Sequence, residues 1–163
     1  MEPAVADQKR REPAEHGIDQ ALDAPFGDVG QFSHAQKSPY RRPGAWHHII
    51  VRGIERRKIF DDNQERNDFL SRLGDILEQT QTACYAWALI PNHFHLLLRT
   101  GACPVATVMR RLLTGHAISY NQRHNRHGHL FQNRYKSILC REDTYFLELV
   151  RYIHLNPLRT RLV

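Results

Sequence analysis

Two histidines one residue apart interrupt an apolar run near the middle of the chain. The run is PNHFHLLL, residues 91–98, and the two residues are His93 and His95. Side chains alternate between the faces of a β-strand, so on a strand both imidazoles point to one face and Phe94 points to the other. Two imidazoles placed in this way can share a metal ion, although a third ligand must then come from elsewhere. The alternative is a pair of polar residues on an exposed face of a sheet.

A third ligand is available near the C-terminus, in the stretch LVRYIHLNP. Tyr152 and Asn156 are four residues apart, so they share one face of a predicted helix. Asn156 would supply a ligand oxygen, and Tyr152 would place a phenol beside the metal. A phenol that attacks a phosphoryl group polarised by a metal makes a phosphoryl-transfer site. The alternatives are that Tyr152 is a packing aromatic and that Asn156 caps the helix before Pro157.

The elements that must position these residues follow from periodicity, capping and turn signals. Four strands are predicted, at residues 45–53, 83–90, 93–100 and 130–140. Three helices are predicted, at residues 61–80, 105–124 and 142–156. The acidic pair Asp61 and Asp62 caps the first helix, and Pro157 ends the last one.

The resulting order of elements is β-α-β-β-α-β-α. Its first six elements form the split βαβ arrangement of an α+β, ferredoxin-like fold, in which two helices cover one face of an antiparallel sheet. Phe94 suits the helix-covered core, which leaves the two histidines on the other face. The last helix, which carries Tyr152, is extra, and it must pack on that open face or on the edge of the sheet.

The composition excludes several classes of protein. No apolar stretch approaches the roughly 20 residues that span a membrane, and the N-terminus lacks the apolar core of a secretory signal, so a cytoplasmic protein is expected. The three cysteines form no C-x-x-C pair, which argues against a zinc knuckle or a redox motif. Residues 1–43 lack periodicity and are rich in Pro, Gly and charged residues, which predicts a disordered tail before one domain over residues 44–163.

Positive charge is concentrated in the C-terminal part of the chain. Residues 1–44 carry 6 Lys/Arg and 7 Asp/Glu, a net charge of −1, whereas residues 99–163 carry 11 and 3, a net charge of +8. This asymmetry favours a polyanionic partner, with nucleic acid as the first candidate. The alternative is a solvated basic face without a partner.

Four stretches of the chain together resemble a known family. They are GAWHHIIVRGIERRKIF, WALIPNHFHLLL, GHLFQNRYKS and RYIHLNPLR, which follow one another between about Gly44 and Val163. In content and order they are similar to the REP-associated tyrosine transposases, relatives of the single-tyrosine transposases of small insertion sequences. Both groups belong to the HUH nucleases, named for the His-hydrophobic-His motif. Their fold is the ferredoxin-like sheet predicted above.

The resemblance implies a metal-dependent transposase. His93, His95 and Asn156 would hold Mg²⁺ or Mn²⁺. Tyr152 would attack single-stranded or hairpin DNA, forming a 5′-phosphotyrosine and releasing a 3′-hydroxyl, and a later attack by another strand end would rejoin the DNA. Such a protein would be a monomer or a homodimer associated with the nucleoid.

The resemblance and the charge pattern also indicate residues around this centre. The expected DNA-binding residues are Arg110, Arg111, Arg123, Arg126, Arg134 and Lys136. Four aromatics could stack on bases or pack in the core, namely Trp46, Tyr120, Phe131 and Tyr135. Glu148 and His154, on the helix of Tyr152, are expected to support the metal ligands.

The chain departs from the family pattern in two places. The family's TGY reads TGH here, so His116 replaces an aromatic, which affects either DNA contacts or packing. Many relatives continue past NPLR, so the C-terminus is expected to be truncated.

Three alternatives stay open at this point. Tyr120, on the second predicted helix, is a rival nucleophile that ranks well below Tyr152. A non-catalytic protein that binds hairpin DNA or RNA would use the same basic face with a degenerate HUH site. A zinc-dependent hydrolase would need a glutamate base near the histidines, and Glu148 is the only acidic residue of the last helix that could serve.

Overall fold

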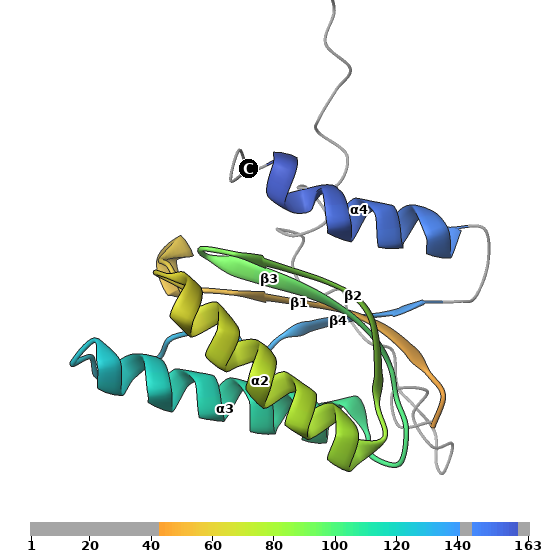
Figure 1. Ribbon diagram of the computed structural model, residues 1–163, viewed down its shortest axis with the longest axis horizontal. Helices are drawn as coiled ribbons and strands as arrows, with labels where there is room; N and C mark the ends of the chain where they lie inside the picture. The colour runs from red at the N-terminus through yellow and green to blue at the C-terminus, as the bar shows by residue number, and fades with distance from the viewer. Residues whose placement is uncertain (1–42, 141–144, 160–163) are drawn as a thin grey trace, which may run out of the picture. The chain divides into compact units, whose positions relative to one another are not determined.

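Four strands of this chain form a single antiparallel sheet. The computed structural model describes residues 43–140 and 145–159, so the predicted tail lies outside the described residues apart from Pro43 (Figure 1). The elements are β1 Trp46–Arg52, the 3-10 turn η2 Ile54–Arg56, α2 Asn63–Thr80, β2 Ala83–Ile90, β3 His93–Arg99, α3 Val105–Arg123, β4 Lys136–Cys140 and α4 Tyr145–Arg159. The strand order β2-β3-β1-β4 inserts β3 between β1 and β2, which confirms the predicted split βαβ, ferredoxin-like fold. None of the helices in the described part of the chain is long and apolar enough to cross a membrane.

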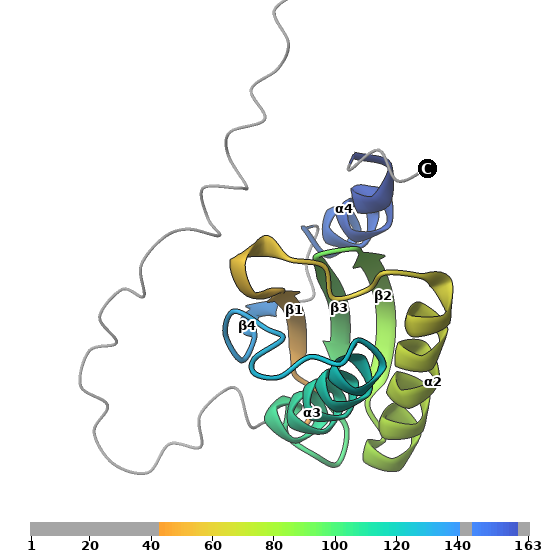
Figure 2. The same ribbon diagram turned by 90° about the vertical axis from the view of Figure 1, so that its left-hand side faces the viewer.

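Helices α2 and α3 cover one face of this sheet (Figure 2). The first turn of α2 is capped by Asp62, whose carboxylate accepts a hydrogen bond from the backbone amide of Glu65 at 2.9 Å. The apolar side chains along one side of each helix are buried in one cluster with Phe94 and Leu96 of β3. They are Phe69, Leu73, Ile76, Val105, Val108, Met109, Leu112 and Leu113. This larger core holds α2 and α3 in place.

Helix α4 lies on the opposite face, over β2 and β3 (Figure 1). Its buried side chains Leu149 and Ile153 pack against Ala86, Ala88 and Leu97 in a second, smaller core. The two alanines of β2 add little bulk, so the helix can approach the sheet closely. The last helix therefore occupies the face that α2 and α3 leave open.

Two predicted boundaries are wrong. β4 covers Lys136–Cys140 rather than residues 130–140, because its ladder with β1 stops at Ile50↔Lys136 and resumes only as a single bridge between Gly53 and Phe131. Between these two pairings, the segment that leads into β4 contains more residues than the matching segment of β1. The extra residues cannot pair, so the segment bends out of the ladder. α4 continues to Arg159 instead of ending before Pro157. A proline removes one helical hydrogen bond, but the residues after it can still adopt helical dihedral angles.

His116, where the resembling family has an aromatic residue, is part of the larger core. Its side chain is 3% exposed, and its ring centroid lies 4.9 Å from that of Phe60 and 5.2 Å from that of Phe69. Its Nε2 donates a hydrogen bond to the backbone carbonyl of Ile59 at 2.8 Å. Burial lowers the pKa of this imidazole from its ordinary value of 6.5. His116 therefore serves packing.

We predict that His116 contributes to acid sensitivity of the fold. The unfolded chain accepts a proton on this imidazole near pH 6.5, whereas the folded state resists it, so the stability that depends on neutral His116 is complete above that pH and is lost as the pH falls. The loss is at most about 1.4 kcal/mol per pH unit. The free energy of unfolding of His116→Phe, measured by urea denaturation, should therefore fall less than that of the wild type between pH 7 and pH 5. Equal losses in the two proteins would contradict this prediction.

Candidate active site

Four predicted site residues converge between β3 and α4. The amide nitrogen Nδ2 of Asn156 lies 3.4 Å from Nε2 of His95, although 61 positions separate the two residues in the chain. The ring centroid of His95 lies 5.2 Å from that of His93. It lies 5.9 Å from the ring centroid of Tyr152, which stands perpendicular to it. The structure thus brings a second imidazole, an amide and a phenol close to His95.

The geometry of β3 and α4 explains this convergence. Alternation along β3 puts Phe94 in the larger core and His95 on the α4 side of the sheet. On α4, Ile153 is buried against the sheet, and Asn156, one turn further, is buried as well. Tyr152 packs at the edge of the same small core and stays partly exposed. The apolar contacts of α4 therefore set the rotation at which its polar residues meet β3.

Burial keeps His95 neutral. Its side chain is 2% exposed, and burial, followed by the nearby His48 and His93, lowers its pKa to about 3. The Nε2 atom of His48 lies 3.1 Å from Nδ1 of His95, and burial lowers the pKa of His48 to about 4. A neutral imidazole is the form that binds a metal ion. His95 is therefore in this form near neutral pH.

Asn92 orients His93. Its side-chain oxygen lies 2.7 Å from Nδ1 of His93, and because an amide oxygen only accepts, Nδ1 carries the proton and Nε2 carries the lone pair. The backbone of Asn92 is held as well, since its carbonyl accepts from the amide of Gly53 at 2.8 Å. A Cβ atom at Gly53 would meet the carbonyl oxygen of Arg57 at 2.1 Å, so a glycine is needed where this loop turns back. The loop after β1 thus holds the turn that precedes the histidines.

The donor set of this site suits a divalent cation. His93 and His95 offer imidazole nitrogens, and the side-chain amide of Asn156 offers an oxygen atom. Imidazole nitrogen and amide oxygen together are typical ligands of divalent first-row metal ions. The two ring nitrogens of His95 face the side chains of His48 and Asn156, both of which are uncharged at neutral pH.

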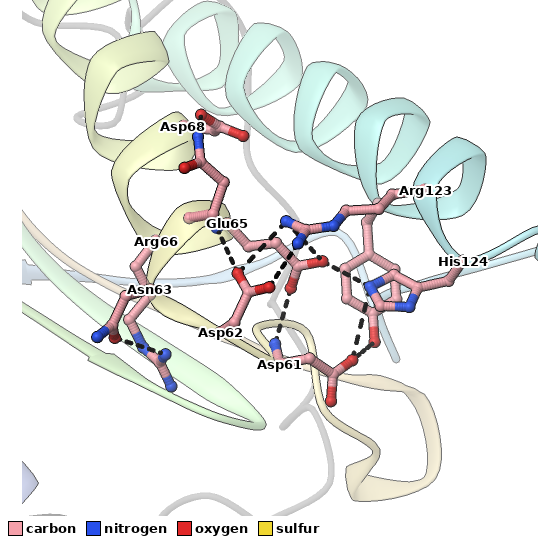
Figure 3. Close-up of polar contacts among 10 residues, drawn as sticks. Asp61, Asp62, Asn63, Glu65, Arg66, Asp68, Arg123 and His124 are labelled. Atoms are coloured by element: carbon pink, nitrogen blue, oxygen red, sulfur yellow. Dashed lines mark hydrogen bonds and ion pairs between the residues drawn. The ribbon is translucent and has the colours of Figure 1, made fainter.

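A second group of ligand-type side chains lies between the N-terminus of α2 and the C-terminus of α3. Ligand atoms of Asp61, Glu65 and His124 lie within 4.8 Å of one another. They already bind one another, because Nε2 of His124 lies 2.5 Å from Oε1 of Glu65, and the backbone amide of Asp61 donates to Oε2 of Glu65 at 2.7 Å (Figure 3). Arg123 forms an ion pair with Asp62 beside them. This guanidinium and the positive end of α2 already compensate the carboxylates, so we interpret the group as a clamp between two helices.

Tyr120, the rival nucleophile, belongs to this clamp. It is 5% exposed, and its hydroxyl donates a hydrogen bond to Oδ2 of Asp61 at 2.7 Å. Burial and then this hydrogen bond raise the pKa of Tyr120 to about 12, which makes its phenolate hard to form. It lies on α3, which covers the face of the sheet opposite to α4 (Figure 1). The geometry favours Tyr152.

The predicted DNA-binding side chains are divided between the two sides of the sheet. Lys136 lies on the α4 side, because it is paired with Ile50, which is paired with His95, and directly paired residues point to the same face. Two strand spacings, or about 10 Å, separate it from His95. Arg123 is engaged by Asp62 in the clamp. Arg110, Arg111 and Arg134 are exposed, and Arg126 lies over the ring of Tyr120.

The four aromatics proposed for base stacking all take part in packing. Trp46 is 7% exposed and contacts the ring of Phe146 of α4 edge to face, with centroids 4.6 Å apart. Tyr120 is engaged in the clamp. Phe131 and Tyr135 pack against the larger core.

The residues that were predicted to support the two histidines differ from the residues that contact them in the structure. Glu148 and His154 are exposed on α4. The observed neighbours are Asn92 and His48, neither of which sequence reasoning singled out. Asn92 lies in the turn before β3, and the contact of His48 depends on the register between β1 and β3.

Comparison with protein families identifies the chain. The family model described as "Transposase IS200 like" matches residues 43–156, which is more than half of the sequence and includes every residue of the candidate site. The chain belongs to the IS200-like transposase family. The resemblance drawn from the four motifs is thereby confirmed. Among curated proteins, no sequence matches this transposase at a significant level.

The chain is similar to two solved structures of transposases. One is the structure of a REP-associated tyrosine transposase bound to a REP hairpin, with a TM-score of 0.60 and 16% identity, covering 81% of this chain and 76% of that chain. Another is a candidate transposase from Deinococcus radiodurans R1, with a TM-score of 0.48 and 19% identity, covering 76% of this chain and 96% of that one. At 16% identity, the first likeness supports the fold of this IS200-like transposase and leaves the roles of individual residues to the geometry above.

We predict that a divalent cation binds at His93, His95 and Asn156 and not at the clamp. In a Mn²⁺ titration followed by NMR, the signals of His95 and its neighbours on β3 should broaden first, because paramagnetic relaxation falls steeply with distance. His124 in the clamp is the internal control, and its signals should broaden only at higher concentrations. Selective broadening at His124 would assign the cation to the clamp.

Proposed function

We propose that this transposase cleaves and rejoins single-stranded DNA with Tyr152 as the nucleophile, beside a divalent cation held by His93, His95 and Asn156. The observation that carries the proposal is the convergence of these four side chains from β3 and α4. Under an apolar helix, imidazoles pack no better than leucines, and they have to be hydrogen-bonded when buried. A chemical role is therefore the better account of these residues.

The reaction exchanges one phosphate ester for another. The phenol oxygen of Tyr152 attacks the scissile phosphorus and forms a P–O bond, while the bond from phosphorus to the 3′ oxygen breaks. The phenol loses its proton and the departing oxygen gains one, so a 5′-phosphotyrosine and a 3′-hydroxyl result. Attack by the 3′-hydroxyl of another strand end reverses this exchange and releases Tyr152. The phosphotyrosine conserves the ester bond, so strand transfer needs no external energy.

The residues of the chain position the Tyr152 phenol and determine the protonation and orientation of the histidines. α4 holds the Tyr152 ring perpendicular to His95, and its partial burial limits the orientations of the phenol, which favours attack along one direction. Burial keeps His95 neutral, and Asn92 orients His93. When bound, the cation would stabilise the negative charge that develops on the phosphate oxygens. Of the two predicted ions, Mn²⁺ suits a mixed nitrogen and oxygen donor set better than Mg²⁺, which prefers oxygen.

The proposed substrate is single-stranded or hairpin DNA. The support is the net charge of +8 in residues 99–163, the position of Lys136 on the side of the candidate site, and the REP hairpin bound by the structural relative. A cytoplasmic, nucleoid-associated location and a monomeric or homodimeric state stay predictions. A zinc-dependent hydrolase is less well supported, because its base, Glu148, is exposed on α4. A non-catalytic hairpin-binding protein is the alternative that the next experiment addresses.

We predict that Tyr152→Phe abolishes the covalent protein–DNA adduct, because only the attacking oxygen is lost, and that it keeps Mn²⁺ and DNA binding. The adduct is measured on a denaturing gel after incubation with hairpin oligonucleotides. The matched control is Tyr120→Phe, which should keep the adduct and lose about 0.5–1.5 kcal/mol of stability through its lost hydrogen bond. An adduct with Tyr152→Phe but none with Tyr120→Phe would identify Tyr120 as the nucleophile. Absence of an adduct with the wild type on every hairpin would favour the non-catalytic protein.

We predict that Lys136 contacts a DNA phosphate. The affinity for single-stranded DNA should fall steeply with salt. In a plot of log affinity against log salt concentration, the slope of Lys136→Gln should be less negative than that of the wild type by about 0.7, as expected for the loss of one phosphate contact. Lys58→Gln removes the same charge from a lysine that pairs with Asp61 in the helix layer, and it should leave the slope unchanged. The slopes come from fluorescence anisotropy titrations at several salt concentrations. Equal slopes for the wild type and Lys136→Gln would place the DNA elsewhere.

A further inference from the structure

His48 is a buried histidine that the reaction described above does not use. It lies on β1, on the α4 side of the sheet, diagonally across from His95, because Ile50 is paired with His95 and His48 is paired with Leu97. Its side chain is 6% exposed. Its ring stacks beside that of His95 with centroids 5.3 Å apart and 22° between the planes. Its Nε2 faces Nδ1 of His95 at 3.1 Å.

The hydrogen bonds around His95 determine which of its nitrogens carries the proton. On one side, Nε2 of His95 faces Nδ2 of Asn156, and an amide NH₂ group can only donate, so Nε2 is the acceptor. A neutral imidazole has one proton, which must then be on Nδ1. From there it is donated to Nε2 of His48. In this tautomer the Nε2 lone pair of His95 points to the side of Asn156, where α4 brings the candidate site together.

We propose that His48 is a positioning residue, which accepts the Nδ1 proton of His95 and thereby keeps Nε2 of His95 in the form that can bind a cation. This inference rests on the proposed function. Metal-ligating histidines in general donate their second ring nitrogen to a protein acceptor, which fixes the tautomer and the orientation of the ring. In this chain a second imidazole takes the place of the usual carboxylate or carbonyl.

The other histidine of the motif provides an internal comparison. The proton of His93 is held on Nδ1 by the side-chain oxygen of Asn92, a different residue on a different element. Both imidazoles therefore have the same tautomer but separate acceptors. A substitution of His48 should change His95 and leave His93 as it is.

Four variants separate positioning from packing. His48→Leu removes the acceptor. His48→Gln keeps an oxygen near the place of Nε2, and His48→Asn keeps a polar amide that is too short to reach it. His47→Leu is the matched control, because His47 is the neighbouring buried histidine but contacts Ser137 of β4. Folding of each protein is checked by circular dichroism, and if His48→Leu does not fold, the Gln and Asn pair carries the test.

The first measurement uses the metal-free protein. Two-dimensional NMR spectra that correlate ring ¹⁵N with ring ¹H report the tautomer of each histidine. We expect His95 of the wild type, of His48→Gln and of His47→Leu to have its proton on Nδ1. In His48→Leu and His48→Asn a population with the proton on Nε2 should appear for His95 only. The second measurement is Mn²⁺ affinity by electron paramagnetic resonance, which should fall at least about 10-fold in these two variants and be restored in His48→Gln.

The outcomes separate this inference from the proposed function. An unchanged tautomer of His95 and an unchanged Mn²⁺ affinity in His48→Leu or His48→Asn would overturn the role of His48, even if the wild type forms the DNA adduct. A change of tautomer in a protein that neither binds Mn²⁺ nor forms an adduct would support the hydrogen-bonding role and contradict the proposed function. Loss of Mn²⁺ affinity in all three His48 variants, His48→Gln included, with the tautomer unchanged would make His48 a metal ligand and would also overturn the inference.

Discussion

The packing of α4 on the sheet is the contact on which the candidate site depends. Leu149 and Ile153 pack on the small side chains of Ala86 and Ala88 and on Leu97 of β3. Each large apolar side chain buried in this way contributes roughly 1.5–3 kcal/mol, so the polar residues do not have to hold the helix in place. A shift of one residue along α4 would rotate its side chains by roughly 100° and carry Asn156 away from His95. The apolar contacts of α4 therefore position polar residues that are not part of the apolar core themselves.

One face of the sheet carries the larger hydrophobic core, and the other face carries the candidate site. The face under α2 and α3 holds the larger core, including His116 in an aromatic environment, and the clamp that joins the ends of the two helices (Figure 3). The face under α4 has a smaller core, beside which His48 and His95 are buried. Burying two imidazoles there is tolerated because each is hydrogen-bonded and neutral. The same neutrality makes them suitable ligands.

Environment, rather than residue type, separates the groups that were candidates for the same role. Tyr120 donates to a carboxylate inside the clamp, so its hydroxyl is already committed, whereas Tyr152 stands beside His95 at the edge of the small core. In the same way, the carboxylates of the clamp are compensated by Arg123 and by the end of α2, whereas the ring nitrogens of His95 face the side chains of His48 and Asn156. A set of ligand-type residues is therefore weak evidence for a metal site until its existing partners are known.

The sequence by itself determined the fold class, the order of the elements and the face on which each element presents its side chains, because strand and helix periodicities are local properties. His93 and His95 share a face of β3, and Tyr152 and Asn156 share a face of α4, for this reason alone. Sequence periodicity could not show that β4 would lose its register with β1, that α4 would continue past Pro157, or that Glu148 would be exposed. The tertiary structure alone decided that His48 and Asn156 would meet opposite nitrogens of His95, because contacts between distant segments depend on strand register and helix packing, which no single segment encodes.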